Sequence, residues 1–174
     1  DLKPGDRVFI AGAGPIGIIM CQTARAFGAS EIIVSDPAPE RRELALQHGA
    51  TDVIDPMVTD LKTANLEVDA FIDAAGVTPA VVSGIYTVKP AGRVVLVGMG
   101  ADEIPLPIPQ IQNRELVVTG IFRYTDTWPL GIHLVASGKV DLDALVTSTY
   151  GLDDAATALD RAGAPEEMKV VIRP

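Results

Sequence analysis

The sequence has one cysteine, two histidines and no long apolar run, and each scarcity excludes a class of protein. Cys21 has no partner for a disulfide within the chain. One cysteine and two histidines, His48 and His133, are too few ligands for a cysteine-rich or multi-histidine metal site. No apolar run approaches the roughly 18 residues of a membrane span. No basic stretch precedes an apolar one, as it would in a signal peptide. We therefore expect a cytoplasmic protein that does not bind membranes.

Positive charge is also scarce. Lys and Arg number 14 against 23 Asp and Glu, which gives a formal net charge of -9. This balance argues against nucleic acid or an anionic membrane as the main partner. Hydrophobic residues make up 48% of the 174 residues and charged residues 21%, which indicates a well-packed globular domain and excludes general disorder.

Apolar strand-like runs alternate with segments of helical periodicity. We expect strands at Val8–Gly14, Glu31–Asp36, Asp52–Asp55, Val68–Gly76, Gly92–Gly100 and Glu115–Phe122. We expect helices at Pro15–Phe27, Glu40–His48 and Thr78–Lys89, the first with an apolar face of Ile16, Ile19, Met20, Thr23 and Phe27. This order predicts an α/β Rossmann fold: a doubly wound, six-stranded parallel sheet with helices on both faces.

The segment before the last strand and the C-terminal tail depart from this rhythm. Ile104–Arg114 has three prolines at alternate positions, which predicts an extended segment at the sheet edge. The tail predicts helices at Asp126–Ser137 and Asp153–Ala162, and short strands at Leu145–Tyr150 and Lys169–Ile172. We divide the chain into a Rossmann core, residues 1–124, and a short helix and strand tail, residues 125–174.

A glycine motif connects the first strand to the first helix. Gly12, Gly14 and Gly17 form GAGPIG, a G-x-G-x-x-G pattern. In a dinucleotide site the first glycine permits the tight turn, the second lets a pyrophosphate approach, and the third lets the helix pack closely on the strand. The helix N-terminus attracts an anion. The alternative is three turn and packing glycines without a ligand.

Asp36 lies at the end of the second predicted strand, about 20 residues beyond the glycine motif, where an acidic residue binds the ribose hydroxyls of NAD. Its carboxylate would repel a 2′-phosphate, so we expect NAD rather than NADP. Asp36 could instead cap the following helix. Arg41 and Arg42 lie near enough to bind a 2′-phosphate, but such arginines more often stack on adenine or lie solvated on the helix.

Small residues end the fourth and fifth strands, at Ala74–Gly76 and Val97–Gly100. Small side chains there would let a flat ligand lie across the sheet where its strand order reverses. Gly98 and Gly100 could equally serve only a turn.

Three segments resemble zinc-dependent medium-chain dehydrogenases: DLKPGDRVFIAGAGPIG, VKPAGRVVLVGMG and VVTGIFRYTDTWPLGIHLVASGKVDLDALV. Within that family the chain looks most like the sorbitol, xylitol and polyol branch, and FRYTDTWP is the most branch-specific piece. DAAGV departs from the acidic-Cys-Thr-Gly sequence that is frequent in that branch. The resemblance implies that the chain is the cofactor domain of a longer enzyme, with the zinc ligands in a separate GroES-like catalytic domain.

The resemblance also implies roles for individual residues. The glycine motif would bind the pyrophosphate, with Asp36 on the ribose and Arg41 near the adenosine. The strand ends would line the nicotinamide and hold its carboxamide. The implied cofactor-binding residues are Gly12, Gly14, Pro15, Ile16, Gly17, Asp36, Arg41, Ala75, Gly76, Val97, Gly98, Met99, Ile121, Phe122 and Arg123. Arg123 and Tyr124 would reach toward the substrate; alternatively, Arg123 only forms an ion pair and Tyr124 only packs on the sheet.

In the activity implied by the resemblance, zinc polarises an alcohol oxygen and NAD accepts a hydride from the adjacent carbon of a small alcohol or polyol. The chain alone would not oxidise an alcohol. Two alternatives are the cofactor domain of a zinc-independent NADPH quinone or enoyl reductase, and a stand-alone NAD-sensing module. Apolar residues in the proline-spaced segment Ile104–Ile111 would pair between subunits, so we expect a homo-oligomer of the intact protein.

Overall fold

The main sheet follows the apolar runs of the sequence. The computed structural model describes residues 2–122, 125–164 and 166–174. Within them, six strands form one sheet: β1 (Arg7–Ala11), β2 (Glu31–Ser35), β3 (Asp52–Ile54), β4 (Val68–Asp73), β5 (Val88–Leu96) and β6 (Val117–Gly120). The order is β3-β2-β1-β4-β5-β6, and every neighbouring pair is parallel. This is the doubly wound order in which β1 and β4 meet where the strand order reverses, and it confirms the predicted fold.

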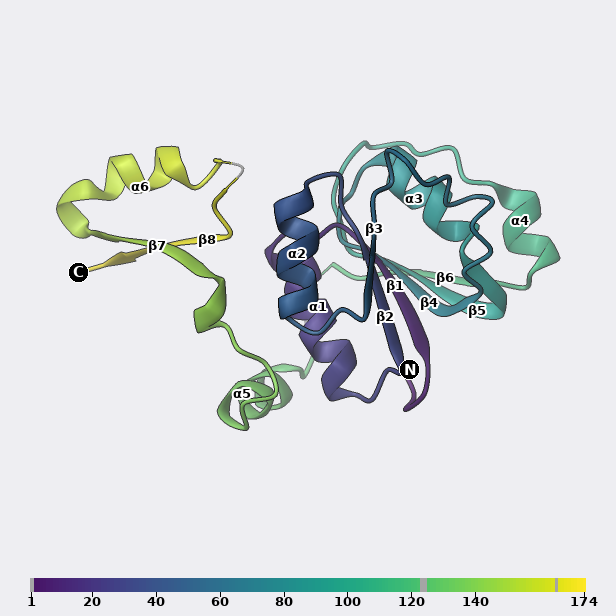
Figure 1. Ribbon diagram of the computed structural model, residues 1–174, viewed down its shortest axis with the longest axis horizontal. Helices are drawn as coiled ribbons and strands as arrows, with labels where there is room; N and C mark the ends of the chain where they lie inside the picture. The colour runs from purple at the N-terminus through teal and green to yellow at the C-terminus, as the bar shows by residue number, and fades with distance from the viewer. Residues whose placement is uncertain (1, 123–124, 165) are drawn as a thin grey trace.

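Helices cover both faces of this sheet (Figure 1). One face carries α1 (Pro15–Ala26) and α2 (Pro39–Gln47); the other carries α3 (Thr78–Ile85) and α4 (Ile108–Asn113). Alternation along β1 places Val8 and Ile10 in the first core and Phe9 and Ala11 in the second. Both faces are therefore buried, as the continuous apolar run of β1 predicts.

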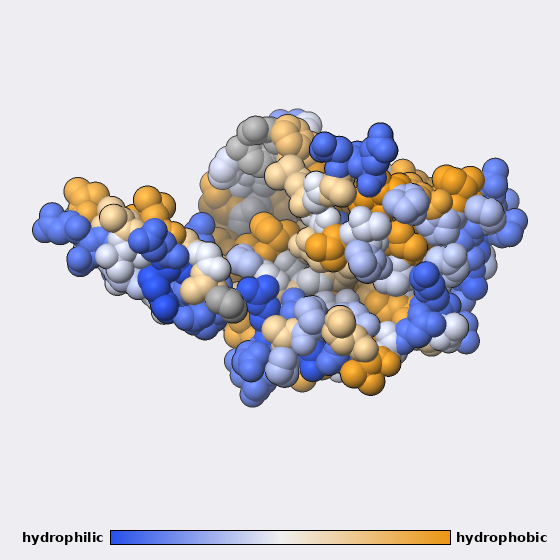
Figure 2. All heavy atoms as spheres, turned by 90° about the horizontal axis from the view of Figure 1, so that it is seen from above, coloured by the Kyte–Doolittle hydropathy of each residue, from blue (hydrophilic) through white to orange (hydrophobic). Residues whose placement is uncertain are grey.

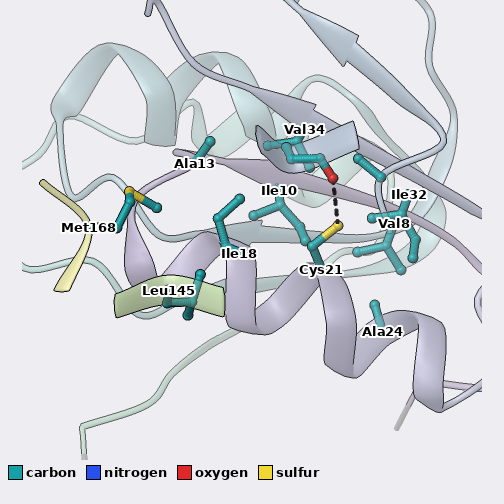
Figure 3. Close-up of a cluster of buried hydrophobic side chains, with 12 residues drawn as sticks. Val8, Ile10, Ala13, Ile18, Cys21, Ala24, Ile32, Val34, Leu145 and Met168 are labelled. Atoms are coloured by element: carbon teal, nitrogen blue, oxygen red, sulfur yellow. Dashed lines mark hydrogen bonds between the residues drawn. The ribbon is translucent and has the colours of Figure 1, made fainter. Parts of the chain in front are cut away.

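The buried face of α1 differs from the predicted one. Gly17, Ile18, Cys21 and Ala24 are buried, whereas Ile16 is 51% exposed. Small side chains let the helix approach the strands closely (Figure 3). The helix therefore packs on the sheet largely through its small residues and not through the most apolar residues of its sequence. Of the predicted face, Ile19 and Met20 are partly buried against the first core, and Ile19 and Thr23 line an apolar pocket with α5 (Trp128–Ala136).

The boundary between α3 and β5 also differs from the prediction. The helix ends at Ile85 rather than Lys89, and β5 begins at Val88 rather than Gly92. Thr87 and Val88 are fully buried, and Val88 lies opposite Val68 of β4 before the register shifts. Burial of two β-branched residues against the sheet overrides the helical pattern here.

The prediction of an extended edge at Ile104–Arg114 is wrong in its second half, which is the helix α4. Pro107 is the N-cap residue of α4, and Pro109 is its second residue. A proline is tolerated in the first turn because the N–H that it lacks would have no partner within the helix. The prolines therefore begin a helix, and β6 is the edge strand.

The tail forms a second, smaller unit. Two parallel strands, β7 (Val146–Gly151) and β8 (Lys169–Arg173), pair with one another, and α6 (Ala155–Arg161) connects them. Two 3₁₀ helices flank β7, at Asp143–Leu145 and Leu152–Asp154. Figure 1 shows β7, β8 and α6 projecting beyond α1 and α2, and Figure 2 shows the same arm with hydrophobic side chains on its surface. The predicted tail elements are confirmed to within a few residues.

The tail is held to α1 by polar and apolar contacts. The Gln22 amide donates to the Asp141 carbonyl (3.0 Å) and accepts from the Asp141 N–H (2.6 Å). Leu145 and Met168 are buried in the core cluster under α1 (Figure 3). Among the described residues, no helix is both long and apolar enough to cross a membrane.

Close packing of α3 on β4 gives a test of the second core. A Cβ on Gly84 would lie 2.1 Å from the Phe71 ring, which itself stacks on Phe9 at a centroid distance of 5.5 Å. Gly84→Ala should therefore destabilise the fold by about 1–3 kcal/mol, measured by urea unfolding. The matched control is Gly131→Ala in α5, where no described atom lies within 4 Å of the added Cβ. The control should be neutral or stabilise by up to about 1 kcal/mol through helix propensity, and an equal loss in both variants would contradict the packing argument.

Candidate functional site

The glycine motif forms a tight turn at the carboxyl end of β1. Gly12 has φ +98°, a conformation that favours glycine, and its N–H donates to the Ser35 carbonyl at 2.7 Å. A Cβ on Gly17 would lie 1.9 Å from the Gly12 carbonyl oxygen, so α1 must have glycine where it crosses the turn. No described heavy atom lies within 4 Å of the Cβ position of Gly14. The first and third glycines thus serve packing, and the second leaves space for a ligand.

The N-terminus of α1 points its amides toward this space. Gly14 is the N-cap residue, Pro15 is the first helical residue, and Ile16 follows with its side chain half exposed. Gly14 has no side chain that could accept from the amides of the first turn. These N–H groups and the helix dipole favour an anion such as a pyrophosphate at this point.

Asp36 joins the glycine motif to the turn after β2. Its Oδ2 accepts from the Ala13 N–H and its Oδ1 from the Ala38 N–H, both at 2.9 Å, and the residue is only 5% exposed. Ala38, not Asp36, is the N-cap residue of α2, so Asp36 does not cap the helix, although its bond to the Ala38 N–H begins the turn before it. Each carboxylate oxygen has a further lone pair that could accept from a hydroxyl.

Arg42 lies directly behind Asp36. Its Nη1 donates to the carbonyls of Asp36 (2.7 Å) and Pro37 (2.9 Å), and its Nη2 lies 3.2 Å from the Asp55 carboxylate. The predicted alternative of a solvated Arg42 on the helix surface is therefore wrong, because the guanidinium holds the β2–α2 turn. Arg41 is the third residue of α2 and is partly buried.

Sequence reasoning missed the role of Asp73, the last residue of β4. Its Oδ1 accepts from the N–H groups of Ala75 (3.2 Å) and Gly76 (3.1 Å), and it is only 1% exposed. Its carbonyl accepts from the N–H groups of Val97 (3.0 Å) and Gly98 (2.9 Å) after β5. Asp73 thereby fixes two adjacent turns. An acidic residue ending an apolar strand before Ala-Ala-Gly was the available signal.

The predicted residues after β4, β5 and β6 lie at the same end of the sheet as the glycine motif. A Cβ on Gly12 would lie 3.1 Å from the Ala75 nitrogen, and one on Gly98 would lie 2.2 Å from the Gly76 nitrogen. Ile121 donates its N–H to the Leu96 carbonyl at 2.9 Å. The structure thus brings together Gly12, Gly14, Pro15, Ile16, Gly17, Ala75, Gly76, Val97, Gly98, Met99, Ile121 and Phe122 along one edge, with Asp36 beside the first of them.

Met99 and Phe122 are well exposed at this edge, at 84% and 76%. Arg123 and Tyr124, for which substrate contacts are predicted, lie outside the described residues. Across the described part of the chain, no three His, Cys, Asp or Glu side chains come together as metal ligands would. The described residues at this edge offer the glycine turn, the helix N-terminus and the carboxylate that a dinucleotide site needs.

A sequence profile described as zinc-binding dehydrogenase matches residues 15–137, well over half of the chain. The chain belongs to the zinc-binding dehydrogenase family. It is 39% identical over 168 residues to the sorbitol dehydrogenase of Bacillus subtilis, covering 92% of this chain and 48% of that protein. It is 37% identical over 183 residues to D-xylulose reductase A of Aspergillus oryzae, covering 99% and 51%. This family member thus spans about half the length of the curated relatives it matches.

Solved structures of similar proteins share the fold. The 2R,3R-butanediol dehydrogenase of Bacillus subtilis has a TM-score of 0.91 and 30% identity, covering 100% of this chain and 52% of that one. A protein from Sinorhizobium meliloti 1021, described as a zinc-binding dehydrogenase and bound to NADP, has a TM-score of 0.93 and 31% identity, covering 99% and 54%. These matches confirm the family resemblance and its Rossmann cofactor-domain fold.

Cys21 gives a pH-dependent prediction that separates a packing role from a reactive one. Cys21 lies in α1, where it is fully buried (Figure 3), and its thiol faces the Ala45 carbonyl. Burial raises the pKa of the thiol from 9.0 to about 12, and the charge of Arg25 acts in the opposite direction. The unfolded thiol ionises near pH 9, so its contribution to stability is complete below that pH and is lost as the pH rises toward 12. We expect the wild type to lose up to about 2 kcal/mol more than Cys21→Ala between pH 8 and 10.5. Parallel urea-unfolding profiles would contradict the burial of the thiol.

Proposed function

We propose that this chain binds NAD across the carboxyl ends of β1, β4, β5 and β6. The observation that carries the proposal is the open space over Gly14, with the buried Asp36 carboxylate beside it at the end of β2. The pyrophosphate would lie against the first turn of α1, and a ribose hydroxyl would donate to Asp36. Arg41 would lie near the adenosine.

The charge beside the ribose favours NAD over NADP. Asp36 is nearly buried and already accepts two amide hydrogen bonds, so it cannot turn away from a 2′-phosphate without losing both. A phosphate carries a charge of about −1.5 to −2 near neutral pH and would be repelled by the carboxylate. The NADP in the Sinorhizobium meliloti protein leaves dual specificity as the competing proposal.

We further propose that the chain serves as the cofactor domain of a zinc-dependent alcohol or polyol dehydrogenase. The names of its relatives support this: one is a sorbitol dehydrogenase, one a D-xylulose reductase and one a butanediol dehydrogenase. NAD, when bound, supplies the acceptor for a hydride from a secondary alcohol. The zinc ligands would come from outside the described residues, because these contain no metal-ligand cluster.

The contribution of this chain to such a reaction is positioning. Asp73 holds the turns after β4 and β5 together, so the backbone under the nicotinamide is fixed before the cofactor arrives. Val97, Gly98 and Met99 would line the ring, and Ile121 and Phe122 would hold the carboxamide. A preformed surface reduces the entropy lost when the cofactor is oriented for transfer.

Several expectations from the sequence remain predictions. These are the division after residue 124, the substrate contacts of Arg123 and Tyr124, the inactivity of this chain alone, the homo-oligomer and the cytoplasmic location. The alternative of a zinc-independent NADPH reductase is weighed by the cofactor measurement below, and that of a stand-alone NAD-sensing module remains open.

Calorimetric titration with NADH and with NADPH tests cofactor choice. We expect NADH to bind at least about tenfold more tightly, a difference of about 1.4 kcal/mol. Asp36→Asn, which removes the charge but keeps the shape of the side chain, should reduce that preference. Equal or tighter binding of NADPH by the wild type would contradict the selection by Asp36 and would favour the reductase alternative.

Gly14→Ala tests the place of the pyrophosphate. The backbone of Gly14 (φ −71°, ψ −177°) suits alanine, and no described atom lies within 4 Å of the added Cβ, so stability should change by less than about 0.5 kcal/mol. The methyl group would occupy the space of the ligand, so NADH affinity should fall about tenfold or more.

Gly151→Ala is the matched control, because Gly151 has a similar backbone (φ −74°, ψ 165°) and equally open surroundings among the described atoms, but lies in the tail. It should leave both stability and NADH affinity unchanged. Unchanged affinity in Gly14→Ala would place the pyrophosphate elsewhere.

A further inference from the structure

An ion pair behind Asp36 links the turns after β2 and β3. We infer that the pairing of Arg42 with Asp55 is a determinant of cofactor selectivity, because it holds a guanidinium that is bonded to the Asp36 carbonyl away from the 2′ position of the ribose. This inference rests on the proposed NAD site. It assigns a selectivity role to two residues that would not themselves touch the bound cofactor.

Three contacts hold the Arg42 guanidinium against the turn after β2. Nη1 donates to the Asp36 and Pro37 carbonyls, and Nη2 pairs with Asp55 Oδ2. The side chains of Arg42 and Asp55 are only 18% and 29% exposed, so solvent screens this pair less than a surface pair. The carboxylate of Asp36 does not contact Arg42 among the contacts described; it accepts from the N–H groups of Ala13 and Ala38.

Asp55 is itself held by the loop that follows β3. Its Oδ1 accepts from the Met57 N–H at 2.9 Å, and its carbonyl accepts from the N–H groups of Val58 (3.2 Å) and Thr59 (2.9 Å). The β2 and β3 strands are neighbours, and the Asp36 N–H donates to the Ile54 carbonyl at 3.3 Å. Asp55 is therefore an anchored carboxylate, and Arg42 is the longer side chain of the pair.

The charges explain how the pair affects selectivity. Asp36, Asp55 and Arg42 together carry a net charge of −1, and the positive charge of Arg42 is paired with Asp55. Without the Asp55 charge, the guanidinium loses its ionic anchor, and its long side chain can reorient toward a phosphate on the ribose. An arginine forms short, charge-assisted hydrogen bonds with a phosphate. The pair thus keeps the Arg42 guanidinium from binding the 2′-phosphate of NADP.

The test compares NADH and NADPH affinities in the wild type and in Asp55→Asn by calorimetric titration. The asparagine removes the charge and keeps an oxygen that can accept from Met57. NADPH affinity should rise about tenfold, the effect of one new charge-assisted phosphate contact, while NADH affinity stays within about twofold. Because the gain is electrostatic, it should shrink when salt is raised from about 0.05 to 0.5 M.

A double variant separates this mechanism from simple loosening of the turn. Arg42→Gln combined with Asp55→Asn has no guanidinium to reorient, so it should lose the gain in NADPH affinity. If Asp55→Asn melts well below the wild type, Asp55→Ser, which also offers an oxygen to Met57, replaces it with the same expectation.

Four results would overturn the inference. An unchanged NADPH to NADH ratio in a wild type that binds NADH would refute the role of the pair and leave the NAD site intact. Equal weakening of both cofactors, or persistence of the gain in the double variant, would show that the pair acts only on the shape of the turn. If the wild type binds neither cofactor, the proposed function itself fails and the inference fails with it.

Discussion

The carboxylate of Asp36 bonds the turn after β1 to the turn after β2, and the geometry of the candidate site depends on this connection. One oxygen accepts from Ala13 in the glycine motif and the other from Ala38 before α2, with the residue almost fully buried. A buried carboxylate is costly unless it is hydrogen-bonded, so the two amides make its burial possible. At the end of β4, the Asp73 carboxylate accepts from Ala75 and Gly76 in its own turn, and the Asp73 backbone carbonyl accepts from Val97 and Gly98 after β5. The site is therefore a set of turns at the end of a parallel sheet, joined through the Asp36 carboxylate and the Asp73 carbonyl.

Glycines let these turns pack closely enough to meet. The Gly12 turn lies against Ala75, Gly17 crosses over Gly12, and Gly98 packs on Gly76, each at a distance that leaves little or no room for a side chain. Gly14 differs because its surroundings are open among the described atoms. The same residue type thus has two roles within one motif: close contact at most positions and ligand access at one. This contrast explains why the spacing of the motif is informative when its composition alone is not.

Particular elements show how far the sequence pattern extends. The strands were placed to within a few residues because burial on both faces requires a continuous run of apolar residues. The buried face of α1 was misassigned because much of its sheet side is built from small residues, Gly17, Cys21 and Ala24, while Ile19 and Thr23 line a pocket with α5. The prolines before β6 begin α4 instead of extending an edge, since a proline fits both an extended segment and a first helical turn.

By itself the sequence determined the fold class with its parallel sheet, the glycine turn and the acidic residue at the end of the second strand. These follow from local chemistry: side-chain periodicity, backbone freedom at glycine and spacing along the chain. Only the tertiary structure decided that Arg42 holds the Asp36 turn through Asp55 and that Asp73 joins the turns after β4 and β5. Such contacts join segments that are distant along the chain, and parallel strands bring them together only once the sheet has formed.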